Sequence, residues 1–278
     1  DRAQLDDSGR ALVSVLLRSR HTGVIERAAQ GLALACERLL LSPVVELASL
    51  PAEWLAELLA TAFGTLDEPL LDGLRLSDTC RGRLTDGETS TSRSLTFLRR
   101  SAGLPHATIA ILTAEPAGRS GGAYGGPIFI AVMRSLVQSA QADGPDRWLP
   151  RVHALKLLRM IFLNRAFVLQ TMPHVGAGFL AALRALSAAE WNVRNSGMLL
   201  FAALNERALR QRRTREDSES GANADDANGI GVRDFFGRAP ELLAFLSSSL
   251  SDADAGGTAA GLDPFPMLQL LSRLVASP

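Results

Sequence analysis

The sequence predicts an all-α protein, an irregular HEAT- or armadillo-like helical-repeat solenoid. Apolar residues recur at helical spacing along most of its 278 residues, and no stretch shows the alternation of a convincing strand. The helical segments are each roughly 12–18 residues long, and many are joined by short turns without a fixed repeat length. A compact helical bundle is the alternative.

Five helices are expected in the first half of the chain. The first is typical, because Leu12, Val13, Leu16 and Leu17 recur at i, i+1, i+4 and i+5 before Arg20–Gly23 interrupts the pattern. Proline, glycine or polar residues bound the others, as expected at helix ends. The five ranges are 9–19, 24–41, 50–63, 92–115 (bent near residue 103) and 128–139.

Five more helices are expected in the second half, beginning after the turn at Asp143-Gly144-Pro145. Proline precedes or opens most of them, as it does in the first turn of many helices. Their ranges are 150–162, 174–188, 191–210, 240–250 and 266–275.

Four polar or Gly-rich segments are expected to be flexible, and the ten helices are expected to form one domain over residues 1–278. The four segments are 65–92, 116–127, 211–232 and 252–261. Glycines in the second of them invite a phosphate-loop interpretation, but no strand precedes them and no Gly-Lys-Ser/Thr follows. The chain begins without methionine, so we expect an excerpt of a longer protein.

The segment Arg99-Arg100-Ser101-Ala102-Gly103-Leu104-Pro105 joins two apolar helical patterns. Gly103 has dihedrals open to it that other residues avoid, and Pro105 disfavours the α region for Leu104. We therefore expect a helix that stops or bends near Gly103 and restarts with Pro105 in its first turn. Arg99 and Arg100 would then be held at a helix end, where guanidinium forks suit phosphates or carboxylates. Solvated or acid-paired arginines are the alternative.

Composition excludes several classes of protein. The 29 basic and 29 acidic residues give zero formal net charge, so contact with nucleic acid must come from a local patch. Cys36 and Cys80 form neither a metal spacing nor a disulfide framework. No apolar run reaches the roughly 18–20 residues of a membrane span, so no membrane insertion is expected.

Catalytic motifs are equally scarce. The sequence has no His-Glu-x-x-His or Cys-x-x-Cys motif, and its one Gly-x-Ser-x-Gly spacing, Gly118–Gly122, lies in the Gly-rich segment that no strand precedes, so it does not form a nucleophile elbow. The four histidines are scattered over different helices and are expected to be buried or capping residues: His21, His106, His153 and His174. A binding or scaffolding role is favoured, and neither a metal nor a cofactor is expected.

A second basic cluster follows the helix that begins at Trp191. It contains five arginines, at positions 207, 210, 212, 213 and 215. Arginines there can attract phosphates, and they also favour the C-terminal end of a helix through its dipole. Both interpretations stay open.

Four stretches, in this order, resemble the THADA family, named after thyroid adenoma-associated protein. They are Arg20-His21-Thr22-Gly23-Val24-Ile25-Glu26, the Arg99–Pro105 segment, the Trp191-Asn192-Val193-Arg194-Asn195-Ser196-Gly197-Met198-Leu199-Leu200-Phe201 block, and the closing pair Phe235-Phe236-Gly237-Arg238-Ala239-Pro240 and Leu270-Leu271-Ser272-Arg273-Leu274. One departure is Lys156, the only lysine, where the family pattern suggests asparagine.

The resemblance implies the central domain of a very large helical-repeat protein. Such a protein would be a non-catalytic, cytoplasmic accessory subunit of an FtsJ-type methyltransferase, forming a heterodimer with it. The pair would methylate the 2′-hydroxyl of a ribose at the 5′ edge of the tRNA anticodon loop. The catalytic Lys-Asp-Lys-Glu tetrad of such enzymes needs two lysines and a Rossmann-like sheet, whereas this chain has one lysine and no βαβ pattern. The partner would therefore be the enzyme and would bind S-adenosylmethionine.

The resemblance also suggests which residues bind tRNA or the partner. They are Arg99, Arg100, Ser101, Ala102, Gly103, Leu104 and Pro105, extended by Arg194 and Asn195. A purely architectural role for the motif is one alternative. A protein-interaction scaffold without RNA, for example one that binds a membrane pump, is another, and a cryptic enzyme is a third.

Overall fold

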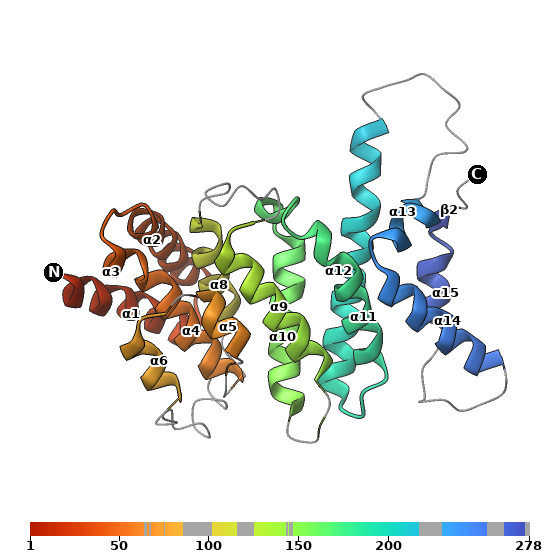
Figure 1. Ribbon diagram of the computed structural model, residues 1–278, viewed down its shortest axis with the longest axis horizontal. Coiled ribbons are helices and arrows are strands. Elements are labelled where there is room, and N and C mark those ends of the chain that lie inside the picture. Colours follow the sequence, from red (N-terminus) through yellow and green to blue (C-terminus); the bar gives the residue numbers. More distant parts are fainter. Residues whose placement is uncertain are drawn as a thin grey trace. The chain divides into compact units, whose positions relative to one another are not determined.

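The fold is all-α and of the helical-repeat class (Figure 1). The computed structural model describes residues 1–63, 66, 68–74, 76–85, 102–115, 125–142, 144, 147–216, 230–254 and 264–275. Contacts cluster into two compact units, Asp1–Ser139 and Ala140–Pro278, and each is described by itself. This division does not test the expectation of a single domain.

The first unit is built from helices, among which α2 packs most extensively against α8 and α1. Its helices are α1 (Arg2–Arg18), α2 (Thr22–Leu40), α3 (Val45–Ala48), α4 (Leu50–Phe63), α5 (Glu68–Leu74), α6 (Asp78–Thr85), α8 (Gly103–Ala114) and α9 (Pro127–Gln141, whose last two residues fall in the second unit).

The core of the first unit lies where α1, α2, α4 and α8 meet. Leu16, Leu32, Leu50, Leu55 and Ile111 are fully buried there. Most of α4 is buried all round its circumference, which is expected of a helix enclosed by others. Apolar burial of this kind stabilises each helix by roughly 1.5–3 kcal/mol per large side chain.

The second unit is organised around the long helix α12 (Trp191–Glu216), which packs against both α10 and α11. Its other elements are α10 (Trp148–Leu163), η2 (Arg165–Phe167), η3 (Met172–His174), α11 (Val175–Leu186), β1 (Ile230–Gly231), α13 (Val232–Gly237), α14 (Pro240–Asp254), α15 (Phe265–Leu271) and β2 (Leu274–Val275).

Aromatic side chains fill the centre of the second unit. The ring of Phe179 on α11 makes edge-to-face contacts with Phe201 on α12 and Phe235 on α13, with centroids 5.7 and 5.9 Å apart. Such contacts add about 0.5–1.5 kcal/mol beyond the buried area. They fasten α13 to the α11–α12 pair.

The short elements α3, η2, η3 and α13 were not expected from the sequence, and two further details differ from the prediction. Helices α5 and α6 lie within 65–92, where a surface connection was expected, and their Leu70, Leu71 and Cys80 are buried. A helix of two turns is too short to show a clear period of apolar residues. Packing against α4, rather than a local pattern, therefore determines α5 and α6. The second is a two-residue parallel pairing, in which Ile230 pairs with Leu274 and Gly231 with Val275.

The ends of the expected flexible segments also change. Helix α12 continues to Glu216 rather than ending near Arg210, and α14 extends to Asp254. The remaining parts of 65–92, 116–127, 211–232 and 252–261 lie mostly outside the described residues. So does the stretch 92–101 of the helix expected before Gly103.

Candidate functional site

Helix α8 begins at Gly103, so the second half of the Arg99–Pro105 segment forms its first turn. Ala102 is the exposed N-cap residue and has no side-chain oxygen to cap the helix. Nδ1 of His106 lies 2.9 Å from the Ala102 carbonyl oxygen. Because a carbonyl only accepts, Nδ1 carries the proton in this hydrogen bond.

Gly103 allows the start of α8 to touch the backbone of α1. A Cβ atom at this position would lie 1.9 Å from the carbonyl oxygen of Leu16 and 2.5 Å from its carbonyl carbon. The backbone of Gly103 itself is helical. Close approach, rather than dihedral freedom, therefore requires glycine here, which corrects the reason given by the sequence.

The expected restart of the helix with Pro105 in its first turn is confirmed, since Pro105 is the third residue of α8. The expectation that Leu104 avoids the α region is wrong. Leu104 is the second residue of the helix and is 2 % exposed, so burial of its side chain outweighs the restriction imposed by Pro105. Arg99, Arg100 and Ser101 lie outside the described residues.

The Trp191 block opens α12, and its arginine is engaged with the backbone. Nη1 of Arg194 donates to the carbonyl oxygens of Ala188 and Ala189 at 2.8 and 2.6 Å. These carbonyls belong to the turn between α11 and α12, so Arg194 fixes that turn. Asn195 is half-buried beside it. Trp191 is 65 % exposed, so its side chain does not contribute to the packing of the helix.

The structure brings these two groups of predicted residues into different units. Residues 102–105 belong to the first unit, whereas Arg194 and Asn195 belong to the second. The two groups are therefore treated as separate candidate sites.

Arg207, the first arginine of the second basic cluster, is also structural. Its Nη2 donates to the carbonyl oxygen of Asn164 at 3.1 Å, at the C-terminal end of α10. Burial lowers the pKa of Arg207 below its usual value. The side chains of the other four arginines lie outside the described residues, so the expectation for them stays a prediction.

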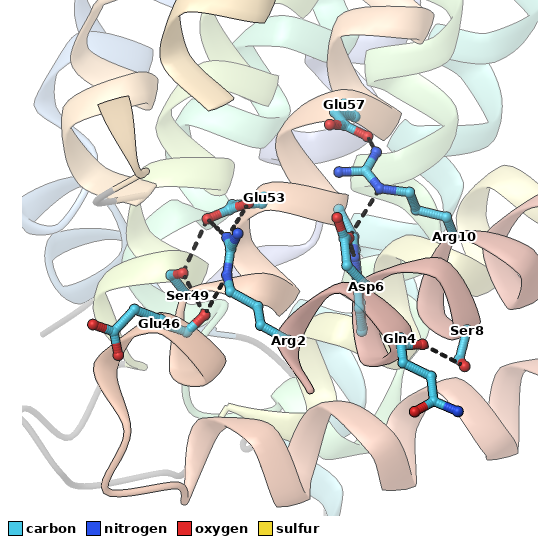
Figure 2. A network of polar contacts seen from close by, with 10 residues as sticks. Arg2, Gln4, Asp6, Ser8, Arg10, Glu46, Ser49, Glu53 and Glu57 are labelled. Carbon is cyan, nitrogen blue, oxygen red and sulfur yellow. Dashed lines mark hydrogen bonds and ion pairs between the residues drawn. The ribbon is translucent and has the colours of Figure 1, made fainter. Parts of the chain in front are cut away.

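Two polar arrangements escaped the sequence analysis, and the first ties α1 to α4 (Figure 2). Arg2 donates to both carboxylate oxygens of Glu53, at 3.0 and 3.1 Å. Glu53 is only 1 % exposed, and it also accepts from Ser49. Arg10 bridges Asp6 and Glu57. The i, i+4 spacing of Asp6 and Arg10 was the one available sequence signal.

A tryptophan completes this arrangement. Nε1 of Trp54 donates to the Asp6 carboxylate at 2.7 Å. Burial by itself raises the pKa of Asp6, but the hydrogen bonds from Trp54 and Arg10 outweigh it and hold the pKa below its usual value. The cluster is fully explained as a clamp between two helices.

The second arrangement is a carboxylate that caps α9. Both oxygens of Glu115 accept backbone N–H groups, one from Ile128 and one from Phe129, each at 2.9 Å. A Cβ atom on Gly126 would lie 2.2 Å from the Glu115 carboxyl carbon. The Gly-rich stretch therefore ends in a tightly packed helix start, in which the carboxylate fills the place of an external anion.

The four histidines lie apart, and their roles differ. His153 is 5 % exposed, as expected for a core histidine, and burial, with the nearby charge of Lys156, lowers its pKa to about 4. His21 is the exposed residue before α2 and makes no side-chain cap. Cys36 is buried, and burial raises its pKa to about 12.

The described part of the chain has neither a metal-binding cluster nor a membrane-spanning helix. There, no three His, Cys, Asp or Glu side chains gather as a metal site would need. None of the helices in the same ranges has both the length and the apolar character needed to cross a bilayer.

Comparison with known proteins assigns the chain to a family. The family model described as THADA/TRM732, DUF2428 matches residues 1–192. The chain belongs to the THADA/TRM732 family. A second model, described as Trm732, C-terminal TPR repeats, matches residues 194–278. The boundary between the two models lies just inside α12, whereas the two compact units divide at residue 139.

Named relatives from animals and a fungus are similar over much or all of the chain. A human protein named tRNA (32-2′-O)-methyltransferase regulator THADA is 31% identical over 283 residues, covering 99% of this chain. A Drosophila melanogaster relative of the same name is 29% identical over 99% of the chain. The Schizosaccharomyces pombe protein named tRNA (32-2′-O)-methyltransferase regulator trm732 is 28% identical over 66%.

The chain spans only a small part of these relatives. It covers 13% of the human protein, 15% of the Drosophila protein and 12% of the fission-yeast protein. No solved structure matches the chain.

Proposed function

We propose that this chain is part of a non-catalytic regulatory subunit of a tRNA 2′-O-methyltransferase that acts at ribose 32, the 5′ edge of the anticodon loop. The observation that carries the proposal is similarity along 99% of the chain to a protein named as the regulator of that enzyme. An FtsJ-type enzyme would be the partner in a cytoplasmic heterodimer, and that enzyme would bind S-adenosylmethionine. The chain itself would need no cofactor.

The mechanism we propose is positioning of the tRNA. Holding a ribose and a methyl donor in productive geometry lowers the barrier without any catalytic group on the regulator. The fixed helix junctions described above fit this role: α8 is seated on α1 through Gly103, and Arg194 fixes the α11–α12 turn. Arg99 and Arg100, which precede α8 in the sequence, would contact phosphate or an acidic patch of the enzyme.

The test is 2′-O-methylation of ribose 32 in cells that lack the full-length protein. Cells would be complemented with wild type or with the Arg99→Ala/Arg100→Ala variant, and protein abundance would be measured alongside. Restoration by wild type alone, at equal abundance, supports both the regulatory role and the role of the two arginines. Normal methylation in the uncomplemented cells would refute the proposal.

A protein-interaction scaffold without RNA is the second candidate. Exposed apolar residues along α12, with Trp191 at 65 % and Met198 at 55 % exposure, favour it, because large exposed apolar side chains occur at protein interfaces. Apolar docking would respond little to salt, whereas tRNA binding through several phosphates would weaken steeply. Measuring the salt dependence of tRNA binding by the full-length protein separates the two candidates.

A further inference from the structure

Three exposed arginines surround the connection between α1 and α2, and we call them the α1–α2 basic turn. Arg18 is the last residue of α1, Arg20 lies in the connection, and Arg27 follows in the second turn of α2. The start of α8 packs on α1 at Leu16, two residues before Arg18. The basic turn therefore lies beside the helix start formed by Gly103, Leu104 and Pro105.

These three arginines have no acidic partner in the described part of the chain. In the same part, Arg2 at the other end of α1 and Arg10 in its middle are paired with carboxylates. Arg27 donates one long hydrogen bond, 3.4 Å, to the neutral side chain of Gln30. Within the described ranges, ion-paired arginines in the first half of α1 thus contrast with three arginines around its C-terminal end that have no acidic partner.

The charge around the basic turn is positive because acidic residues are missing from its neighbourhood in the sequence. No Asp or Glu occurs between Asp7 and Glu26, and none occurs within α8. Glu26 is exposed and is the one acidic residue of the stretch 18–27, so three arginines face one carboxylate. A net local charge of two remains, although the whole chain is neutral.

A structural reason accounts for one arginine but not for all three. Arg18 lies at the C-terminal end of α1, where the helix dipole favours a cation. Arg20 lies beyond that helix, and Arg27 is close to the N-terminal end of α2, where the dipole gives a cation no advantage. In the described part of the chain, neither the helix dipole nor an ion pair accounts for the exposed guanidinium groups of Arg20 and Arg27.

We propose that the α1–α2 basic turn contacts the sugar–phosphate backbone of the tRNA, an inference that rests on the proposed function. Guanidinium groups donate bidentately to phosphate oxygens and keep their charge at all physiological pH values. Residues 15–27 contain no Phe, Tyr or Trp, the side chains that mark the centres of protein interfaces. An RNA backbone therefore fits this turn better than an acidic protein surface does.

The experiment measures tRNA binding by the full-length protein in complex with its methyltransferase over about 50–200 mM salt. The test variant combines Arg18→Ala, Arg20→Ala and Arg27→Ala, and a second variant places lysine at the same three positions. The matched control combines Arg165→Ala, Arg233→Ala and Arg238→Ala, three exposed arginines of the second unit. Melting temperature and co-purification of the methyltransferase are measured for each protein.

The inference predicts weaker binding by the alanine variant, with a slope of log affinity against log salt shallower by about two to three units. The lysine variant should keep most of the slope, and the control should match wild type. An unchanged slope in the alanine variant would overturn the inference, as would an equal loss in the control. Loss of methyltransferase co-purification with tRNA affinity unchanged would instead identify a protein surface and also overturn it.

Complementation separates this inference from the proposed function. If wild-type protein restores methylation of ribose 32 while the alanine variant binds tRNA normally, the inference alone fails. If wild-type protein does not restore methylation, the proposed function fails and the inference fails with it.

Discussion

Replacing Gly103 by alanine tests the contact on which the position of α8 depends. The new Cβ atom would meet the Leu16 carbonyl oxygen at 1.9 Å and its carbonyl carbon at 2.5 Å. Both atoms belong to a helix backbone, so no side-chain rotation relieves the overlap and α8 must move away from α1. Overpacking of this kind costs roughly 1–3 kcal/mol or more. Alanine recovers at most about 1 kcal/mol through its helix propensity.

Because the overlap is with backbone atoms, we take the upper end of this cost, about 3 kcal/mol, and subtracting about 1 kcal/mol leaves a net loss of about 2 kcal/mol in the local stability of the α1–α8 junction. Because each 1.36 kcal/mol changes an equilibrium tenfold, amides that exchange by local opening should exchange about 30-fold faster. The assay is hydrogen exchange of the full-length protein, read on peptides from α1 and α8. Peptides from the second unit serve as the internal reference.

Gly23→Ala is the matched control. Gly23 is the second residue of α2, and a Cβ atom there would meet nothing within 4 Å. This substitution should leave exchange unchanged or slow it slightly, because alanine favours the helix. Equal exchange in the Gly103 and Gly23 variants would refute the argument that Gly103 seats α8 on α1.

Three further substitutions test other parts of the structure. His153 is buried with a pKa of about 4 against 6.5 when free, so it contributes stability above pH 6.5 that is lost as pH falls towards 4. The His153→Leu variant should match wild type at pH 7 and be relatively more stable by about 2 kcal/mol at pH 5. Melting temperatures that fall equally with pH in the two proteins would contradict this. Glu115→Ala leaves two N–H groups at the start of α9 without their acceptor and should lower stability by roughly 1–3 kcal/mol, seen as faster exchange in α9 but not in α2. Arg194→Ala should lower the local stability of the α11–α12 turn by about 1–2 kcal/mol without changing the slope of log tRNA affinity against log salt. A changed slope would show that Arg194 contacts the tRNA.

The helices were predictable where apolar spacing extends over three turns or more. Helices α2, α4, α10 and α11 lie close to their expected ranges. Helices α5 and α6 were missed because seven or eight residues cannot show a period. Their positions depend on burial against α4, which no local pattern records.

The site was only partly predictable, for a different physical reason. The sequence singled out Gly103 correctly but attributed it to a local property of the chain. Its actual partner is the backbone of Leu16, 87 positions earlier, and that distance in sequence hides the contact. Glu115 and its partners at the start of α9 escaped notice for the same reason.

Arginine counts in the sequence likewise do not separate structural from surface residues. Arg2, Arg194 and Arg207 are engaged with carboxylates or carbonyls within the fold, whereas Arg18 and Arg20 have no acidic partner in the described part of the chain. Structural and surface arginines differ in whether an acceptor lies nearby in space, which the sequence does not show.

The most direct test of the regulatory role is methyl transfer in a reconstituted reaction. Purified methyltransferase, S-adenosylmethionine and unmodified tRNA would be incubated with and without the full-length protein, and 2′-O-methylation of ribose 32 would be followed over time. We predict methylation of ribose 32 only when the full-length protein is present. Methylation at the same rate by the methyltransferase alone would contradict the account.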